Sequence, residues 1–371
     1  MTRDLVTVNV ITGFLGSGKT TLLQHLLRDS GMADTAVLIN EIGEVGLDHH
    51  LLERVDESTV LLQSGCLCCT IRGDLAVSMK DLFSRRERGQ IPRFRRLVIE
   101  TTGLADPAPV IYTLMAEDVI RHHFRLGNVV TTVDAVNGAR QHRRHDESRK
   151  QIAVADRIVI TKTDLADGRN LAALEDQLRR LNPSAPRFDS QTDCLTAAKL
   201  LTNDVYDPRT KSNEVARWID AEAFSEHDHA RDSTRGLGRA LGRDHTGKRS
   251  NVHADDINRH DINRHDGGIH AFCLTFDTPM DWTAFGLWLS MLLQRHGEDV
   301  LRVKGLLHVA GVKTPVAVHG VQHIVHPPIH LPRWPDRERR SRIVFIVRNL
   351  SREDIEGSLS AFNALGARAA A

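Results

Sequence analysis

Apolar and β-branched residues dominate three short segments in the first half of the chain, and each segment ends at a polar or glycine-rich turn. The segments cover residues 5–12, 96–100 and 156–161. Apolar runs of this length predict strands that are buried on both faces, as in a parallel sheet. An amphipathic helix is predicted over residues 20–27, directly after the first strand. The pattern favours an α/β fold with a mostly parallel sheet.

The last hundred residues show a different alternation of strand and helix patterns. Strands are predicted over residues 270–276, 300–311, 314–326 and 341–349, and helices over residues 281–297 and 351–362. Ser351 can cap the closing helix, with Asp354 at the third helical position. Trp282 and Trp288 are expected in the core. This part of the chain is therefore predicted to form a smaller α+β domain over residues 269–371.

A polar, histidine-rich segment separates the two parts. Residues 226–268 are rich in alternating charges and too polar to form a core, so we expect a disordered linker after a first domain over residues 1–225. The sequence DINRH occurs twice in tandem within this segment. Seven histidines lie in it or beside it: His227, His229, His245, His253, His260, His265 and His270. Their imidazoles can form weak, exchangeable metal sites, or they can be solvated without a specific role.

Length and charge limit the classes of protein to which the chain can belong. A chain of 371 residues with 41% hydrophobic residues can bury a large core and divide into two domains. The formal net charge of +1 gives no electrostatic reason to expect a nucleic acid or a membrane as partner. No apolar run approaches the roughly 18 to 20 residues that span a bilayer, and the segment before the first strand does not resemble a signal peptide. We therefore expect a cytoplasmic protein.

A glycine-rich loop follows the first strand and fits the phosphate-binding pattern GxxxxGK followed by Ser or Thr. Its candidate phosphate-binding residues are Gly13, Phe14, Leu15, Gly16, Ser17, Gly18, Lys19 and Thr20. Small residues let backbone amides wrap the phosphates, while Lys19 reaches the β and γ oxygens and Thr20 binds magnesium at a helix N-terminus. The sequence therefore predicts a P-loop domain.

Two later strand ends complete a nucleotide site. After the third strand, Thr161, Lys162 and Asp164 fit the guanine-specifying pattern of Asn or Thr followed by KxD. A carboxylate at position 164 can accept hydrogen bonds from the ring N–H and the amine of guanine, a pair that adenine lacks. Glu100 ends the second strand and is expected to hold magnesium through a water molecule, while the Gly103 amide senses the γ-phosphate.

Three of the five cysteines fall within four positions, as Cys66, Cys68 and Cys69. Core thiols or a redox pair are alternatives, but thiolates at this spacing favour a site for zinc, copper(I) or cobalt. Such a site needs a further ligand. Glu41 or Glu44, in a predicted switch segment over residues 39–50, can supply it or can simply be solvated loop charges.

These motifs together resemble the CobW-type GTPases, a metal-handling branch of the P-loop GTPases. The matching segments are GFLGSGKTTLL, INEIGEVGLD, SGCLCCTIRGDL, VIETTGLADPAPV and ITKTDL, with weaker matches in LRVKGLL and GVQ. The resemblance covers residues 5 to about 205 as the GTPase domain and about 269 to 365 as the C-terminal domain. It implies zinc or cobalt binding at the CxCC thiolates, slow GTP hydrolysis and delivery of metal to client proteins.

The leading hypothesis is therefore a GTP-hydrolysing metallochaperone or metal insertase that uses GTP, Mg²⁺ and Zn²⁺, with Co²⁺ as the alternative metal. A metal-buffering protein that stores ions in its histidine-rich linker is the second hypothesis, although it leaves the GTPase motifs unexplained. A nucleotide-dependent kinase is the third, but it needs an adenine site and an acceptor pocket that the sequence does not indicate. The client metalloprotein and the oligomeric state stay open.

Overall fold

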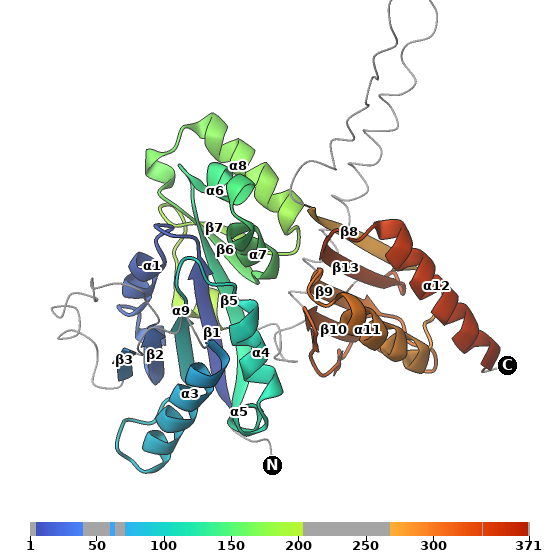
Figure 1. Cartoon of the computed structure of the whole chain (residues 1–371), viewed down its shortest axis with the longest axis horizontal. Helices are drawn as coiled ribbons and strands as arrows, with labels where there is room; N and C mark the ends of the chain where they lie inside the picture. Colours follow the sequence, from blue (N-terminus) through green and yellow to red (C-terminus); the bar gives the residue numbers. More distant parts are fainter. Residues whose placement is uncertain (1–4, 40–59, 64–70, 203–267, 336, 370–371) are drawn as a thin grey trace, which may run out of the picture.

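Two sheets, one parallel and one antiparallel, organise the chain (Figure 1). The computed structural model describes residues 5–39, 60–63, 71–202, 268–335 and 337–369. The strands are β1 Val6–Gly13, β2 Thr35–Ile39, β3 Val60–Gln63, β4 Arg96–Glu100, β5 Phe124–Asp134, β6 Arg157–Thr161, β7 Arg187–Asp189, β8 Ile269–Phe276, β9 Val300–Leu307, β10 Val316–Val321, β11 Ile324–Val325, β12 Ile329–His330 and β13 Ser341–Arg348.

Helices connect most of these strands. They are α1 Lys19–Leu26, α3 Ile71–Glu87, α4 Ala108–Ala116, α5 Asp118–His123, α6 Gly138–Arg144, α7 Asp146–Val154, α8 Gly168–Leu181, α9 Ala197–Leu201, α11 Trp282–His296 and α12 Arg352–Ala369, with the short 3-10 turns η1 Ser30–Met32 and η2 Thr163–Leu165.

The first sheet has seven strands in the order β3-β2-β4-β1-β5-β6-β7. Its pairings are parallel throughout the described residues, so the predicted α/β fold with a mostly parallel sheet is confirmed. The chain passes from β1 at the centre to β2 on one side and later to β5 on the other. Because ligands of such sheets bind outside the carboxyl ends of the strands, this reversal of direction marks the expected site.

Helices cover both faces of the parallel sheet, which explains the near-continuous apolar runs of its strands. Alternate residues of β4 show this directly. Leu97 and Ile99 pack with α3, α4 and α5 in one core cluster, while Val98 packs with α1 and α9 in another. β4 therefore buries both of its faces.

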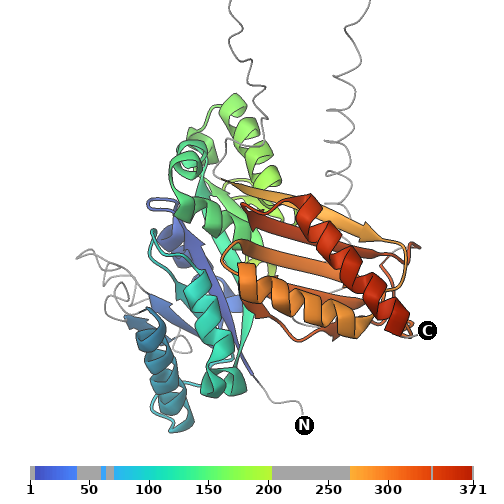
Figure 2. The same ribbon diagram turned by 45° about the vertical axis from the view of Figure 1, so that its right-hand side comes forward.

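The second sheet has six strands, pairs antiparallel and carries α11 and α12 side by side on one face (Figure 2). The predicted α+β domain is thus confirmed. The predicted cap is present, because Ser351 Oγ accepts a hydrogen bond from the Asp354 amide at 3.0 Å. Trp288 is buried at 2% exposure, but the prediction for Trp282 is wrong. Trp282 is the first residue of α11 and is 40% exposed, because it lies where the helix begins rather than over the sheet.

The two domains meet through a cluster of buried charges as well as apolar contacts. Asp156, just before β6, forms ion pairs with Arg302 and Lys304 on β9, and Arg302 also donates to the Val154 carbonyl at the end of α7. Ala153 packs beside them against apolar residues of the second sheet. The C-terminal sheet is therefore bound to the end of α7 and the beginning of β6.

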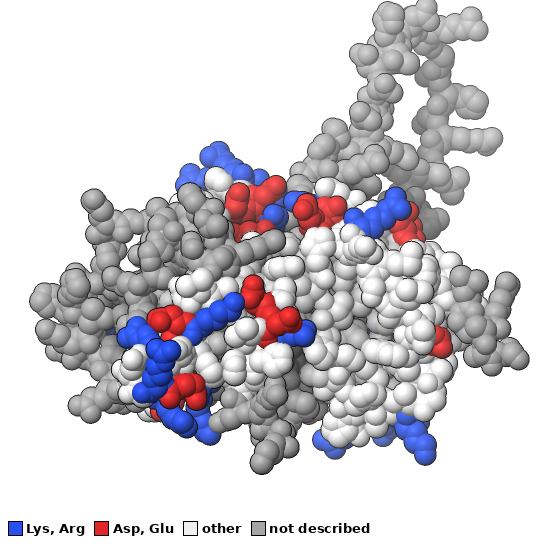
Figure 3. All heavy atoms as spheres, turned by 60° about the horizontal axis from the view of Figure 1, so that its bottom comes forward, with Lys and Arg blue, Asp and Glu red and all other residues white. Residues whose placement is uncertain are grey.

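No helix of the described ranges is both long and apolar enough to cross a membrane. On the face shown in Figure 3, most of the Lys and Arg side chains lie beside Asp and Glu side chains. Elsewhere in the described residues, Lys80 pairs with Glu117 and Arg121 pairs with Asp118. The predicted linker over 226–268 lies almost wholly outside the described residues, and the boundary at 225 lies outside them.

Candidate functional site

The glycine-rich loop leaves the end of β1 at the centre of the parallel sheet and runs into α1. Gly16 and Gly18 have φ angles of 70° and 88°, a left-handed conformation that favours glycine. Lys19 is only 7% exposed, and its Nζ lies 3.4 Å from the Phe14 carbonyl oxygen. The loop therefore curls back over its own lysine, as a phosphate-binding loop requires.

The neighbouring strand β5 holds this loop in place. The hydroxyls of Ser17 and Thr132 lie 2.6 Å apart, and both residues are buried. A Cβ atom at Gly13 would lie 2.3 Å from Thr132 Oγ1, so only glycine allows this approach. Thr132 was not among the predicted site residues, since nothing in the local sequence indicates a contact between positions more than a hundred residues apart.

The two predicted magnesium-side residues meet directly. Thr20 Oγ1 donates to Glu100 Oε1 at 2.6 Å, and Glu100 is fully buried at the carboxyl end of β4. A hydroxyl and a carboxylate are hard oxygen ligands of the kind that Mg²⁺ prefers. The residues present therefore fit a magnesium ion at the end of the phosphate loop.

Gly103 packs tightly against the phosphate loop. A Cβ atom at this position would lie 2.7 Å from Leu15 Cα, a distance that real Cβ atoms essentially never show. Gln151 of α7 fixes the segment from the other side, because its Nε2 donates to the carbonyls of Gly103 and Ala105 at 3.2 and 2.9 Å. Gln151 is a contributor that the sequence-based prediction missed.

The predicted guanine motif lies against the same loop. Thr161 Oγ1 donates to the Ser17 carbonyl at 2.8 Å, and Lys162 Nζ donates to the Gly16 carbonyl at 2.7 Å. Asp164 is exposed on the short turn η2. The structure thus brings the predicted phosphate, magnesium and guanine residues to one edge of the sheet.

Asp134, the last residue of β5, is a further member of this site. Its Oδ2 pairs with Lys162 Nζ at 2.7 Å, and its Oδ1 accepts from the Val136 and Asn137 amides at 2.8 and 3.0 Å. Burial alone would raise the pKa of Asp134. The hydrogen bonds from Lys162, Asn137 and Val136 lower the pKa by more than burial raises it, so the pKa lies below its ordinary value. The sequence offered a signal: like Glu100, this acidic residue directly follows an apolar strand.

The loop after β7 borders the guanine motif on its other side. Asp189 Oδ1 accepts from Thr163 Oγ1 at 2.6 Å and from the Gln191 amide at 2.8 Å. Burial raises the pKa of Asp189, but the bonds from Thr163, Gln191 and Thr192 bring it below its usual range. An ionised Asp189 therefore fixes the turn that carries Asp164, another contact that the sequence did not indicate.

Several predicted residues lie outside the described residues. They are Glu41, Glu44, Cys66, Cys68, Cys69, His227, His229, His245, His253, His260 and His265. His270 is described and exposed at the start of β8. In the described ranges no group of three or more His, Cys, Asp or Glu residues is placed to hold a metal ion. The thiolate site and the weak histidine sites stay predictions.

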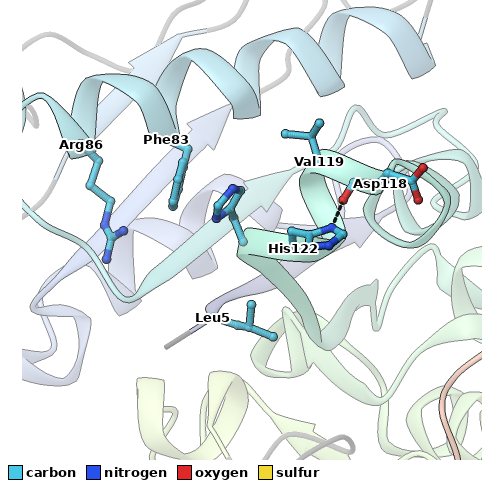
Figure 4. Close-up of a pocket in the computed structure, with 7 residues that line it drawn as sticks. Leu5, Phe83, Arg86, Asp118, Val119 and His122 are labelled. Atoms are coloured by element: carbon cyan, nitrogen blue, oxygen red, sulfur yellow. Dashed lines mark hydrogen bonds between the residues drawn. The ribbon is translucent and has the colours of Figure 1, made fainter. Parts of the chain in front are cut away.

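A pocket of 620 Å³ lies near the amino end of β1, between the end of α3 and α5 (Figure 4). Its lining residues are Leu5, Phe83, Arg86, Asp118, Val119, His122 and His123. Leu5 precedes β1, whereas the phosphate loop follows β1, so the pocket is separate from the nucleotide motifs. The Phe83 and His123 rings stack within it at a centroid distance of 4.2 Å.

Comparison with known families agrees with both domains. Residues 7–189 match the family described as CobW/HypB/UreG, nucleotide-binding domain. Residues 269–363 match the family described as the cobalamin synthesis protein CobW C-terminal domain. The two matches coincide with the parallel and the antiparallel sheet.

Curated relatives extend this similarity. The zinc chaperone YjiA of Escherichia coli is 30% identical over 355 residues, which cover 96% of this chain and 98% of that protein. The zinc-regulated GTPase metalloprotein activator 1 of Schizosaccharomyces pombe is 33% identical over 222 residues, covering 57% of this chain and 52% of that protein. The crystal structure of zinc-bound YjiA GTPase from E. coli has a TM-score of 0.67 at 26% identity and covers 96% of this chain and 99% of that chain.

Proposed function

Since the chain belongs to the CobW/HypB/UreG family of nucleotide-binding proteins, we propose that it is a GTP-hydrolysing metallochaperone that delivers zinc to a client metalloprotein. The observation that carries this proposal is the convergence at one edge of the parallel sheet. Lys19, the Thr20–Glu100 pair and the guanine motif meet there although β1 and β6 are separated by more than a hundred residues.

The residues at this edge have different roles in the proposed GTP hydrolysis. Lys19 and the loop amides bind the β- and γ-phosphates, and Gly103 approaches the same loop from β4. Thr20 and Glu100 would hold a magnesium ion, which would supply positive charge to stabilise the phosphoryl oxygens. A water molecule is the nucleophile in this scheme. None of the predicted motif residues is an evident general base or arginine finger, so we expect slow intrinsic turnover.

Asp164 gives this site its preference for guanine. Its carboxylate is exposed on η2 and therefore free to accept hydrogen bonds from a base that lies over the loop. Adenine lacks the paired donors. The site is therefore expected to select GTP over ATP.

Zinc is the proposed cargo, with cobalt as the alternative. The names of the relatives support zinc, because YjiA is called a zinc chaperone and its crystal structure contains zinc. In this chain, Cys66, Cys68 and Cys69 are the proposed ligands, together with Glu41 or Glu44. The cysteines fall between β3 and α3, and the glutamates fall between β2 and β3, so both segments adjoin strands of the nucleotide sheet.

Nucleotide selectivity tests this function first. Turnover and affinity should be measured for GTP and ATP on the full chain, with and without one equivalent of Zn²⁺. We expect GTP to bind at least about thirtyfold more tightly than ATP, because ATP leaves the Asp164 carboxylate without its paired donors. Equal affinities for the two nucleotides would refute the proposal.

A further inference from the structure

We propose that Asp134 is a positioning residue for guanine nucleotide binding, a role that rests on the proposed function. The Asp134 carboxylate holds the Lys162 ammonium group against the phosphate loop and so prepares the base-binding side of the site before the nucleotide arrives. Asp134 itself does not contact the phosphates or carry out the chemistry. It acts through Lys162.

The Asp134 carboxylate is fixed independently of Lys162. Its Oδ1 accepts from the backbone amides of Val136 and Asn137, which closes the turn that leads into α6. The Asn137 side chain donates to Oδ2 at 3.3 Å. With the Asp134 side chain only 2% exposed, Oδ2 has one fixed direction in which to accept from a lysine.

Lys162 depends on that partner. Its side chain is 38% exposed, and it reaches two fixed oxygen atoms, Asp134 Oδ2 and the Gly16 carbonyl, each at 2.7 Å. Its backbone has φ 58°, a left-handed conformation that is uncommon for a residue with a side chain. A flexible lysine stem held at two oxygens loses little further freedom when a base packs along it.

The position of Lys162 affects both the phosphate loop and the guanine motif. Lys162 links the phosphate loop at Gly16 with the end of β5 at Asp134, and Asp164, the residue proposed to recognise guanine, lies two positions further along the chain. Removing the Asp134 charge takes away the charged partner of the ammonium group and leaves its contact with the Gly16 carbonyl. Because Lys162 lies on the base side and away from the Thr20–Glu100 pair, GTP and GDP should lose affinity equally.

The test uses a double-mutant cycle on the full chain, with Asp134→Asn, Lys162→Met and the double variant. Affinities for GDP and for a non-hydrolysable GTP analogue are measured by titration calorimetry with Mg²⁺, and KM and kcat are measured for GTP. We expect Asp134→Asn to raise both Kd values and KM about tenfold, the loss typical of a hydrogen bond to a charged group. The value of kcat should stay within about twofold, because uniform binding is lost.

The cycle separates positioning from a structural role. If Asp134 acts through Lys162, the double variant should bind about as weakly as Lys162→Met alone. Additive losses, or an unchanged KM in Asp134→Asn, would overturn the inference. Asp134→Ser serves as the second variant should Asp134→Asn not fold, because its hydroxyl can still accept from the Val136 amide.

Asp156→Asn is the matched control, since Asp156 is also buried and paired with cations but lies at the other end of β6. It should lower stability and leave KM unchanged, and a raised KM in this control would also overturn the inference. A wild-type protein that binds neither nucleotide removes the proposed function and this inference together. A wild-type protein that binds GTP while Asp134→Asn binds equally well removes the inference alone.

Discussion

Two buried aspartates hold cations at opposite ends of the strand pair β5 and β6. Asp134 ends β5 at the nucleotide edge, and Asp156 precedes β6 at the domain interface. The side chains of the two residues are almost equally buried, at 2% and 1% exposure. Their cations differ, because Lys162 is 38% exposed whereas Arg302 and Lys304 are 3% and 2% exposed.

The difference shows how surroundings decide what a buried carboxylate does. Around Asp156 both sheets exclude water, so the ion pairs contribute to the contact between the domains and cannot exchange for a ligand. Around Asp134 one side stays open, so a nucleotide can cover Lys162 when it binds. The same residue type therefore supports folding at one end of the strands and ligand binding at the other.

Breaking the buried ion pairs of Asp156 is expected to change stability most. Asp156→Asn leaves Arg302 and Lys304 buried without their carboxylate, which should lower the unfolding free energy by about 3 to 5 kcal/mol. Urea unfolding of the full chain measures the change. Asp118→Asn, which removes the exposed pair with Arg121, is the control and should change stability by less than about 1 kcal/mol. An unchanged urea midpoint in Asp156→Asn would contradict the assignment of this pair to domain contact.

A second variant tests how the nucleotide site recognises guanine. Asp164→Ala should remove about 2 to 4 kcal/mol of preference for GTP over ATP, or roughly thirtyfold to a thousandfold, because paired hydrogen bonds to a carboxylate are lost. Competition titrations with both nucleotides measure the preference. The ATP affinity and the urea midpoint should stay unchanged, since Asp164 is exposed. Retained selectivity would mean that another residue recognises the base.

Gly103→Ala tests the contact between the segment after β4 and the phosphate loop. The added Cβ would lie 2.7 Å from Leu15 Cα, so the segment after β4 must move away from the phosphate loop. Such overpacking typically costs about 1 to 3 kcal/mol, and here we expect it mainly as a lower kcat/KM for GTP. Gly168→Ala is the control, because a Cβ there has no neighbour within 4 Å. Equal rates in the two variants would show that this contact is unimportant for hydrolysis.

The smallest expected effect is a dependence on pH. Burial raises the pKa of Asp156, but Arg302, Lys304 and the Val129 amide lower it below its ordinary value. A lowered pKa gives stability that is present above the unfolded value of about 3.9 and is lost as the pH falls through the folded value. The stability difference between wild type and Asp156→Asn should therefore shrink as the pH falls below about 4. A difference that stays constant from pH 6 to pH 3 would argue against an ionised Asp156.

The sequence predicted those features that depend on neighbouring residues. The phosphate loop, the guanine motif and the Ser351 cap are each short motifs. The structure confirms the cap and brings the loop and the guanine motif into contact, whereas the binding of phosphate and guanine by these residues stays a prediction. Asp189 and the Arg302–Asp156 pair were missed because they depend on contacts between distant segments. Asp134 was also missed, although its position at the end of an apolar strand was a local signal. A charged residue inside a strand such as β9 gives no local sign that a second domain will cover it.

The ends of helices and strands were also harder to predict from the sequence than the helices and strands themselves. The predicted strand over 314–326 is divided into β10 and β11, with Gln322 at φ 49° between them. The closing helix runs from Arg352 to Ala369, beyond the predicted end at 362. The exposed position of Trp282 has the same origin, because where a helix begins relative to the sheet is decided by tertiary packing.

If GTP hydrolysis drives the proposed zinc delivery, the zinc affinity must depend on the bound nucleotide, and a zinc titration against a competing chelator measures this dependence. The titration is made on the full chain with GDP and then with a non-hydrolysable GTP analogue. We expect the zinc affinity to differ by about fivefold or more between the two states, as is typical of coupled sites, and the tight site to disappear when Cys66, Cys68 and Cys69 are replaced by serine. Identical zinc affinities in the two nucleotide states would show that the nucleotide does not control zinc binding.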